Sequence, residues 1–296
     1  MVIRRATHAG SWYPGSKQGL LDALKQYFTD TEFGPNEEPL SLNIEKRTII
    51  GGVSPHAGME YSGPCAAFTY LNLFKEKIPD TVIILGTDHM GHNKTALMAK
   101  GEWETPLGNL KIDEELSNKI LEISKVIKDD DSLFTGFSEQ EHNIEIQLPF
   151  VKFCSIDKDV KIVTIKIRVT RDFKIMNEIS NDIVNAINQM DKDVVIVASS
   201  DMSHKQVSDS TQLQKFKEID LAVIEEFTKL NPEKALEQAS KTTVCGPQTI
   251  TTLVLIGKKF NATKGEKLKY YTSSERTGRI GGYCVGYFSG VIIKNT

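Results

Sequence analysis

Residues 47–56 read RTIIGGVSPH, a β-branched apolar run that ends at a proline and a histidine. Two further runs have the same form: TVIILGTDH at residues 81–89 and VVIVASSDMSH at residues 194–204. Runs this short and this apolar are typical of strands covered on both faces, as in a parallel α/β sheet. Ligands of such sheets bind outside the carboxyl ends of the strands, so the three polar ends predict one shared site.

The ends of these runs carry side chains that can bind a metal or transfer a proton. They are His56, His89, Asp201 and His204. His56 follows a proline, and the small residues after it leave room for a ligand. His92 is in the same loop as His89 but farther from the strand, so we favour His89 as the functional histidine. His8 lies in an apolar and aromatic N-terminal segment that could cover a pocket mouth, and its role is open.

Asp201 and His204 are three positions apart, the spacing of neighbours on a helical turn. A carboxylate beside an imidazole fixes its tautomer and raises its basicity, which suits general acid-base work. The alternative is an N-cap aspartate with an exposed histidine. Because the pair follows a core strand in a loop, we favour the functional interpretation.

Two more candidates lie at predicted helix starts. Ser138 and Glu141 fit the S-x-x-E capping box, which accounts for Glu141 and leaves His142 in the first turn, where a histidine is often merely exposed. Cys245 comes shortly before Pro247, and proline is favoured at the first helical position. We therefore expect Cys245 at a helix N-terminus, where the dipole favours a thiolate that can bind metal or act as a nucleophile. The alternative is a buried cysteine at a turn.

The composition excludes several classes of protein. Lys and Arg number 36 against 39 Asp and Glu, a net charge of −3, so no basic field would attract nucleic acid. No apolar run approaches the ~20 residues of a membrane helix, and the N-terminus lacks a signal-peptide core, so we expect a cytoplasmic protein. The four cysteines contain no C-x-x-C pair, so we expect no zinc ribbon or disulfide and buried thiols at Cys65, Cys154 and Cys284.

Strand-like and helix-like segments alternate along the chain, and no repeat or linker divides it. Strands are expected at 47–54, 80–87, 160–167 and 193–199, with additional strands within 95–112 and 268–292. Helices are expected at 16–29, 62–77, 113–126, 172–191, 211–229 and 247–258. This alternation predicts a single α/β domain over residues 1–296, with a central mixed, largely parallel sheet flanked by helices.

Six short motifs follow one another over nearly the whole chain. They are ATHAGSWY at 6–13, PHAGMEYSG at 55–63, LGTDH at 85–89, EHNIEIQLPF at 141–150, SSDMSH at 199–204 and VCG at 244–246. In this order the motifs resemble the Memo family, which is similar in fold to the class III extradiol dioxygenases. Those enzymes cleave catechol rings with non-haem iron(II), so the resemblance implies a single α/β domain with a metal site.

The resemblance also implies roles for particular residues. The implied metal ligands are His56, His89 and Cys245, and the implied catalytic or pocket-lining residues are His204, Asp201 and His142. The dioxygenases complete their ligand set with a carboxylate, whereas this chain offers Cys245. A thiolate is a softer ligand, so iron(II) is the first expectation for the metal, with copper or zinc as alternatives.

Three functions compete on these grounds. The first is a metal-dependent oxidoreductase acting on a small substrate, with His204 as the proton-transferring residue. The second is a non-catalytic adaptor that binds peptides in the same pocket, as the resemblance to animal members implies, although no Arg cluster suited to phosphate is present. The third is hydrolysis at zinc, which lacks an obvious glutamate base. The resemblance to microbial members also implies a radical-SAM protein as a pathway partner.

Overall fold

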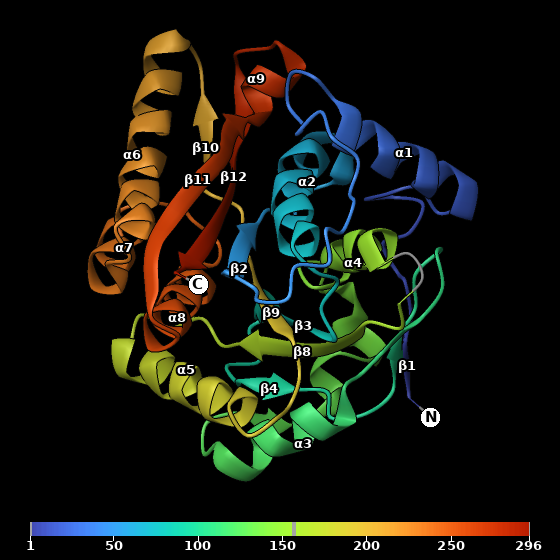
Figure 1. Cartoon of the computed structure of the whole chain (residues 1–296). Helices are drawn as coiled ribbons and strands as arrows, with labels where there is room; N and C mark the ends of the chain where they lie inside the picture. Colours follow the sequence, from blue (N-terminus) through green and yellow to red (C-terminus); the bar gives the residue numbers. More distant parts are fainter. Residues whose placement is uncertain (1, 156–157, 296) are drawn as a thin grey trace.

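Four parallel strands form the centre of the main sheet (Figure 1). The structure, a computed structural model, describes residues 2–155 and 158–295. The sheet has the order β10-β12-β2-β9-β3-β8-β4-β7, with β11 paired to β12. Its central strands are β2 (Ile49–Ser54), β9 (Val194–Ser199), β3 (Thr81–Thr87) and β8 (Lys161–Ile167). Each pairs in parallel with its neighbour, so their carboxyl ends lie at one edge.

The outer strands add the antiparallel part of the sheet. One side carries β12 (Gly282–Lys294), β11 (Ala262–Thr272) and β10 (His204–Val207), and the other carries β4 (Ala96–Leu97) and β7 (Lys128–Asp129). β12 is antiparallel to β2, and β4 is antiparallel to β8. A small separate sheet joins β1 (Ile3–Arg4), β5 (Glu102–Trp103) and β6 (Leu110–Lys111). The expected mixed sheet is confirmed, and its central strands are the parallel ones.

Helices cover both faces of this sheet. α1 (Lys17–Thr29), α2 (Met59–Lys75) and α4 (Leu148–Ser155) pack on one face, and α3 (Glu114–Ile123), α5 (Phe173–Ile187) and α8 (Pro247–Lys259) pack on the other. α6 (Ser210–Thr228) lies beside the long β11–β12 hairpin with α7 (Pro232–Ala239), and α9 (Ser273–Thr277) joins the two strands (Figure 1). Val82 and Ile84 belong to one core, whereas Ile83 and Leu85 belong to the other, as alternation along a doubly covered strand requires.

Most of the expected helices and strands are present with shifted ends. The segment 95–112 forms three two-residue strands, and 268–292 forms most of the β11–β12 pair with α9 between its strands. Three short 3-10 helices are η1 (Asp131–Leu133), η2 (Gly136–Gln140) and η3 (Glu145–Gln147). Helix α7 was not predicted. Its sequence does contain a helix-start signal, because Asn231 is the N-cap and Pro232 is the first helical residue. The expected domain extent of 1–296 stays a prediction, since Met1, residues 156–157 and Thr296 lie outside the described residues.

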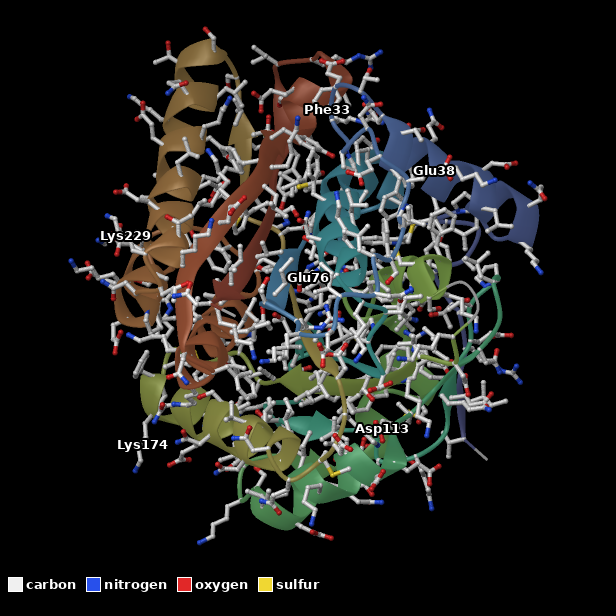
Figure 2. All side chains as sticks on the ribbon, viewed as in Figure 1. Phe33, Glu38, Glu76, Asp113, Lys174 and Lys229 are labelled. Carbon is white, nitrogen blue, oxygen red and sulfur yellow. The ribbon has the colours of Figure 1, made fainter. Side chains whose placement is uncertain are left out.

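Side chains fill the space between the sheet and its helices, and charged groups such as Lys174 lie at the outside (Figure 2). The thiols of Cys65, Cys154 and Cys284 are free and buried, as expected. Within the described residues, no helix is both long enough and apolar enough to cross a membrane.

We predict that Gly86→Ala destabilises the fold by about 1–3 kcal/mol. A Cβ at this position, near the end of β3, would overlap Asn143 and lie 2.5 Å from the Ile144 side chain. Both neighbours are buried, so neither can move away freely. Urea unfolding measures the change. Gly58→Ala is the control, because its Cβ would meet its nearest atom at 3.8 Å, and equal losses in the two variants would contradict the prediction.

Candidate metal centre

A cavity of about 650 Å³ opens at the carboxyl edge of the central strands. Its wall contains all six side chains that the sequence analysis singled out: His56, His89, His142, Asp201, His204 and Cys245. The loops after β2, β3 and β9 supply His56, His89 and Asp201, since parallel strands end at the same edge of a sheet, and His204 begins the next strand, β10. The expectation of one shared site at the three strand ends therefore agrees with the structure.

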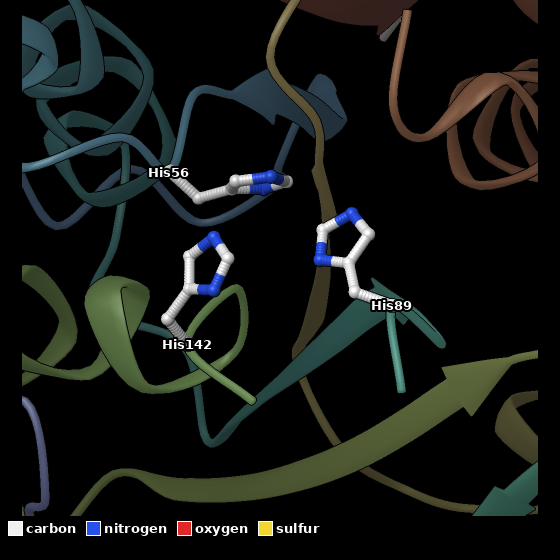
Figure 3. A group of neighbouring side chains, drawn as sticks. All are labelled: His56, His89 and His142. Carbon is white, nitrogen blue, oxygen red and sulfur yellow. The ribbon is translucent and has the colours of Figure 1, made fainter. Parts of the chain in front are cut away.

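Three imidazoles of the cavity wall lie close together (Figure 3). His56, His89 and His142 each offer a ring nitrogen, and these atoms lie within 4.8 Å of one another. The ring centroids are 5.3 to 5.5 Å apart. One ion placed among the three nitrogens would reach each of them, so the group can bind a transition metal. The sequence implied a catalytic or pocket-lining role for His142, and here it lies beside the two expected ligands.

Hydrogen bonds set the orientation of two of these rings. The Nδ1 atom of His56 lies 2.9 Å from the Ser199 hydroxyl, and the Nδ1 atom of His89 lies 3.0 Å from the Glu141 carboxylate. Bonds of this kind fix the imidazole tautomer and leave Nε2 with its lone pair for a metal. The hydrogen bonds of Ser199 and Glu141 with these histidine rings were not predicted from the sequence.

Glu141 does not form the capping box predicted with Ser138. Its carboxylate accepts hydrogen bonds from the His89 backbone amide at 2.8 Å and from the Asn143 side-chain amide at 2.9 Å. Ser138 instead lies within η2, where its hydroxyl is 3.1 Å from His92. Burial opposes ionisation of Glu141, but the hydrogen bond and charge of His89 outweigh it and lower the pKa to about 2. The capping-box prediction is wrong because the acidic side chain turns inward to the histidine.

Burial keeps two imidazoles of the cluster neutral. Loss of solvent lowers the pKa of His56 to about 3 and that of His142 to about 4, and neighbouring imidazoles add to both shifts. Asp201 opposes the first shift and Glu141 opposes the second. A neutral imidazole is the form that binds a metal, so both rings are ready to donate at physiological pH.

Cys245 lies against His56, directly before the Gly246 cap of α8, as its sequence position predicted. Its Sγ atom is 3.2 Å from His56 Nε2 and accepts the Asp201 backbone N–H at 3.2 Å. Burial and the nearby Asp201 charge raise the pKa of the thiol, so the expected thiolate is not favoured by the protein alone. Desolvation opposes the effect of the helix N-terminus at this position. A bound cation would reverse the balance by stabilising the thiolate.

Asp201 and His204 form a pair, but not on a helical turn. His204 begins β10, and its Nε2 atom lies 3.7 Å from Asp201 Oδ2. The other Asp201 oxygen accepts the His56 backbone N–H at 2.7 Å, so one carboxylate links two strand ends. Burial alone would lower the pKa of His204, yet Asp201 outweighs it and raises that pKa above its ordinary value. The expected helical turn is wrong because β10 pairs with β12 at this point.

The N-terminal segment closes one side of the cavity. Trp12 lies on the cavity wall, and its ring centroid is 4.2 Å from that of His142. His8 is held by Glu145, which accepts from its Nδ1 at 2.8 Å and from Tyr13 at 2.6 Å and pairs with the buried Arg4. This buried network was missed, although Glu145 stands three residues after His142. His92 lies apart, with its Nδ1 atom 2.8 Å from Asp88, which agrees with the preference for His89.

Comparison with known proteins places these motifs in one family. The chain matches the family described as "Memo-like protein" over residues 4–291. A MEMO1 family protein of Pyrococcus furiosus is 35% identical, with 99% of this chain and 100% of the relative covered. Another, from Ignicoccus hospitalis, is 32% identical over 94% of both chains, and one from Sulfurisphaera tokodaii is 35% identical over 97% of this chain and 98% of its own.

We predict that the metal-free protein loses stability between pH 7 and pH 5. The unfolded histidines bind protons below about pH 6.5. Folded His56 and His142 bind them only near pH 3 and pH 4. The unfolded state binds more protons in this range, so each histidine is expected to lower the free energy of unfolding by about 2 kcal/mol at pH 5. Urea unfolding at both pH values tests this, and His142→Asn should make the decrease smaller by about 2 kcal/mol. An unchanged pH slope in that variant would contradict the assignment.

We predict that Glu141→Gln weakens zinc binding by about 10- to 100-fold, the usual effect of losing a partner that orients a ligand. The amide keeps the size of the side chain but loses the charge that aligns His89. Competition with a chromogenic chelator measures the zinc affinity. The matched control is Glu38→Gln, which removes an exposed carboxylate in the loop between α1 and β2. Equal affinities in both variants would show that Glu141 does not support the site.

Proposed function

The chain belongs to the Memo family, and on that premise we propose that it binds a redox-active transition metal and acts on a small organic substrate. The observation that carries the proposal is the convergence of three imidazole nitrogens within 4.8 Å of one another on the cavity wall. Nitrogen donors of this type suit iron, copper and zinc, with iron(II) as our first choice.

The donor set fits a metal for two reasons. His56 and His142 are neutral because burial lowers the pKa of each, and the Nδ1 atoms of His56 and His89 already have partners. We propose His56 and His89 as ligands in every case. The resemblance makes Cys245 the third ligand, and the clustering of nitrogens makes His142 the competing third ligand. The contact of Cys245 with His56 supports Cys245 as the third ligand. The three imidazole nitrogens within 4.8 Å of one another support His142.

The remaining residues would handle the substrate and its proton. A bound iron or copper ion would supply electron transfer and the capacity to react with dioxygen. His204 would take a proton from a substrate hydroxyl and return it, because Asp201 raises its pKa and the Thr243 carbonyl, 3.3 Å from Nδ1, orients the ring. Trp12 and Tyr61 would hold the organic part of the substrate and exclude water from the cavity.

Other parts of the proposal concern partners and location. A cavity of about 650 Å³ has the size of a small-molecule pocket, which supports a small substrate over a bound peptide. A radical-SAM protein as pathway partner remains a prediction from the family resemblance. We also propose a cytoplasmic protein, because all four cysteines are free thiols.

We predict that anaerobically purified protein contains about one iron or copper ion per chain. Elemental mass spectrometry should show a near-complete loss of metal in His56→Ala and His89→Ala. Cys245→Ser and His142→Asn identify the third ligand, since the variant that loses more metal removes it. His92→Asn is the control, because His92 is bonded to Asp88 and Ser138 away from the cavity. Metal-free protein that takes up no ion on reconstitution would reject the proposal and favour the adaptor.

We predict that His204→Gln keeps the metal but slows turnover by about 10²- to 10⁴-fold, the usual contribution of a general acid-base residue. Dioxygen consumption by the metal-loaded protein with a panel of catechols and other oxidisable phenols measures this. Gln212→Ala is a control from the exposed start of α6. Unchanged turnover of every accepted substrate in His204→Gln would remove His204 from this role.

A further inference from the structure

Asp220 is a buried carboxyl group that the proposed chemistry does not use. It lies in the middle of α6, and its side chain has no exposed surface. A carboxylate removed from water lowers stability unless hydrogen bonds replace the lost solvent. The contacts of Asp220 therefore indicate what this group does.

Those contacts lead from α6 to the loop that carries the Asp201–His204 pair. Asp220 Oδ1 accepts the Ser203 backbone N–H at 3.0 Å, and Oδ2 accepts the Tyr270 hydroxyl of β11 at 2.8 Å. Ser203 stands directly before His204 and two residues after Asp201. The carboxylate thus binds the backbone between the two members of the pair.

β12 leaves space for this carboxylate. A Cβ at Gly286 would overlap Asp220 Oδ2, so only glycine lets the carboxylate pass the strand. The Gly286 backbone also bonds the same loop, accepting from Met202 at 2.9 Å and donating to the Ser203 carbonyl at 3.0 Å. The loop is therefore held on one side by α6 and on the other by β12.

We propose that Asp220 is a positioning residue that holds the Asp201–His204 segment in place for proton transfer, through the backbone of Ser203. The inference rests on the proposed function, in which His204 carries the proton. Asp220 itself does not line the cavity, and Asp201 and His204 do. Its action is therefore indirect, through the geometry of the loop and through its charge.

The charges near Asp220 are few. The groups that face it are His204 in the loop and Tyr270 on β11, and Tyr270 in turn faces Cys284 on β12 and Glu275 of α9. Glu275 is paired with Lys217, also on α6. Burial raises the pKa of Asp220 to about 6, against hydrogen bonds from Ser203 and Tyr270, so the group is mainly ionised at neutral pH. The negative charge of Asp220 is thus present near His204 and can affect the pKa of that imidazole.

The test compares Asp220→Asn, which removes the charge, with Asp220→Ala, which also removes the acceptor. The chain has six histidines, so histidine labelling gives six imidazole signals, and His204→Gln assigns one of them. In full-length protein incubated with zinc, Asp220→Asn is expected to move the His204 titration midpoint to lower pH. Asp220→Ala should raise amide exchange in the peptide containing Ser203 by about tenfold.

Glu218→Gln is the matched control, because Glu218 is an exposed acid on the same helix and should change neither quantity. Should Asp220→Ala fail to fold, the midpoint in Asp220→Asn alone decides. An unchanged His204 midpoint and unchanged exchange would overturn the inference. Metal content measured on the same samples separates the two proposals: zinc retained with an unchanged midpoint rejects only the role of Asp220, and no metal with a shifted midpoint rejects only the metal function.

Discussion

The parallel pairing of β2, β9 and β3 is the constraint on which the site depends. In this register Val53 lies beside Ala198, and Ala198 lies beside Leu85, so the three strands end together. The residues that follow these strands therefore lie together at one edge of the sheet. The Asp201 carboxylate then joins two of these ends by accepting the His56 backbone N–H. The sheet brings the functional groups together, and a few buried hydrogen bonds set their orientation.

Buried charge is concentrated at this edge and is compensated residue by residue. The Glu141 carboxylate lies within hydrogen-bond distance of the His89 ring. The Asp201 carboxylate accepts the His56 backbone N–H and lies beside the His204 ring. The Glu145 carboxylate is bonded to the His8 ring. Each carboxylate lowers stability through desolvation and recovers it through hydrogen bonds and opposite charge. Burial lowers the pKa of His56 and His142, whereas Asp201 raises the pKa of His204. The same pocket thus contains histidines suited to metal binding and another histidine suited to proton transfer.

The sequence was most informative where chemistry follows a regular strand. His56, His89 and Asp201 could be predicted because uniformly apolar runs mark central strands and the site lies at their ends. Glu141 was misassigned because a capping box and an inward-facing carboxylate share one local pattern, and only tertiary packing distinguishes them. The buried partners Glu145 and Asp220 left no local signal, since each contacts a different element of the fold and not its own helix. Cys245 was placed correctly, but its ionisation depends on desolvation, which position alone does not show.

The residues of the cavity come from widely separated parts of the chain, from the segment containing Trp12 to Tyr287 in the last strand. Closing such long loops makes folding slow, because their entropy must be lost before the distant contacts are gained. During synthesis, His56 and His89, which follow β2 and β3, emerge long before α8 and β12 do. The wall of the cavity is therefore completed only after nearly the whole polypeptide has left the ribosome, although His56, His89 and His142 all emerge with the first half of the chain.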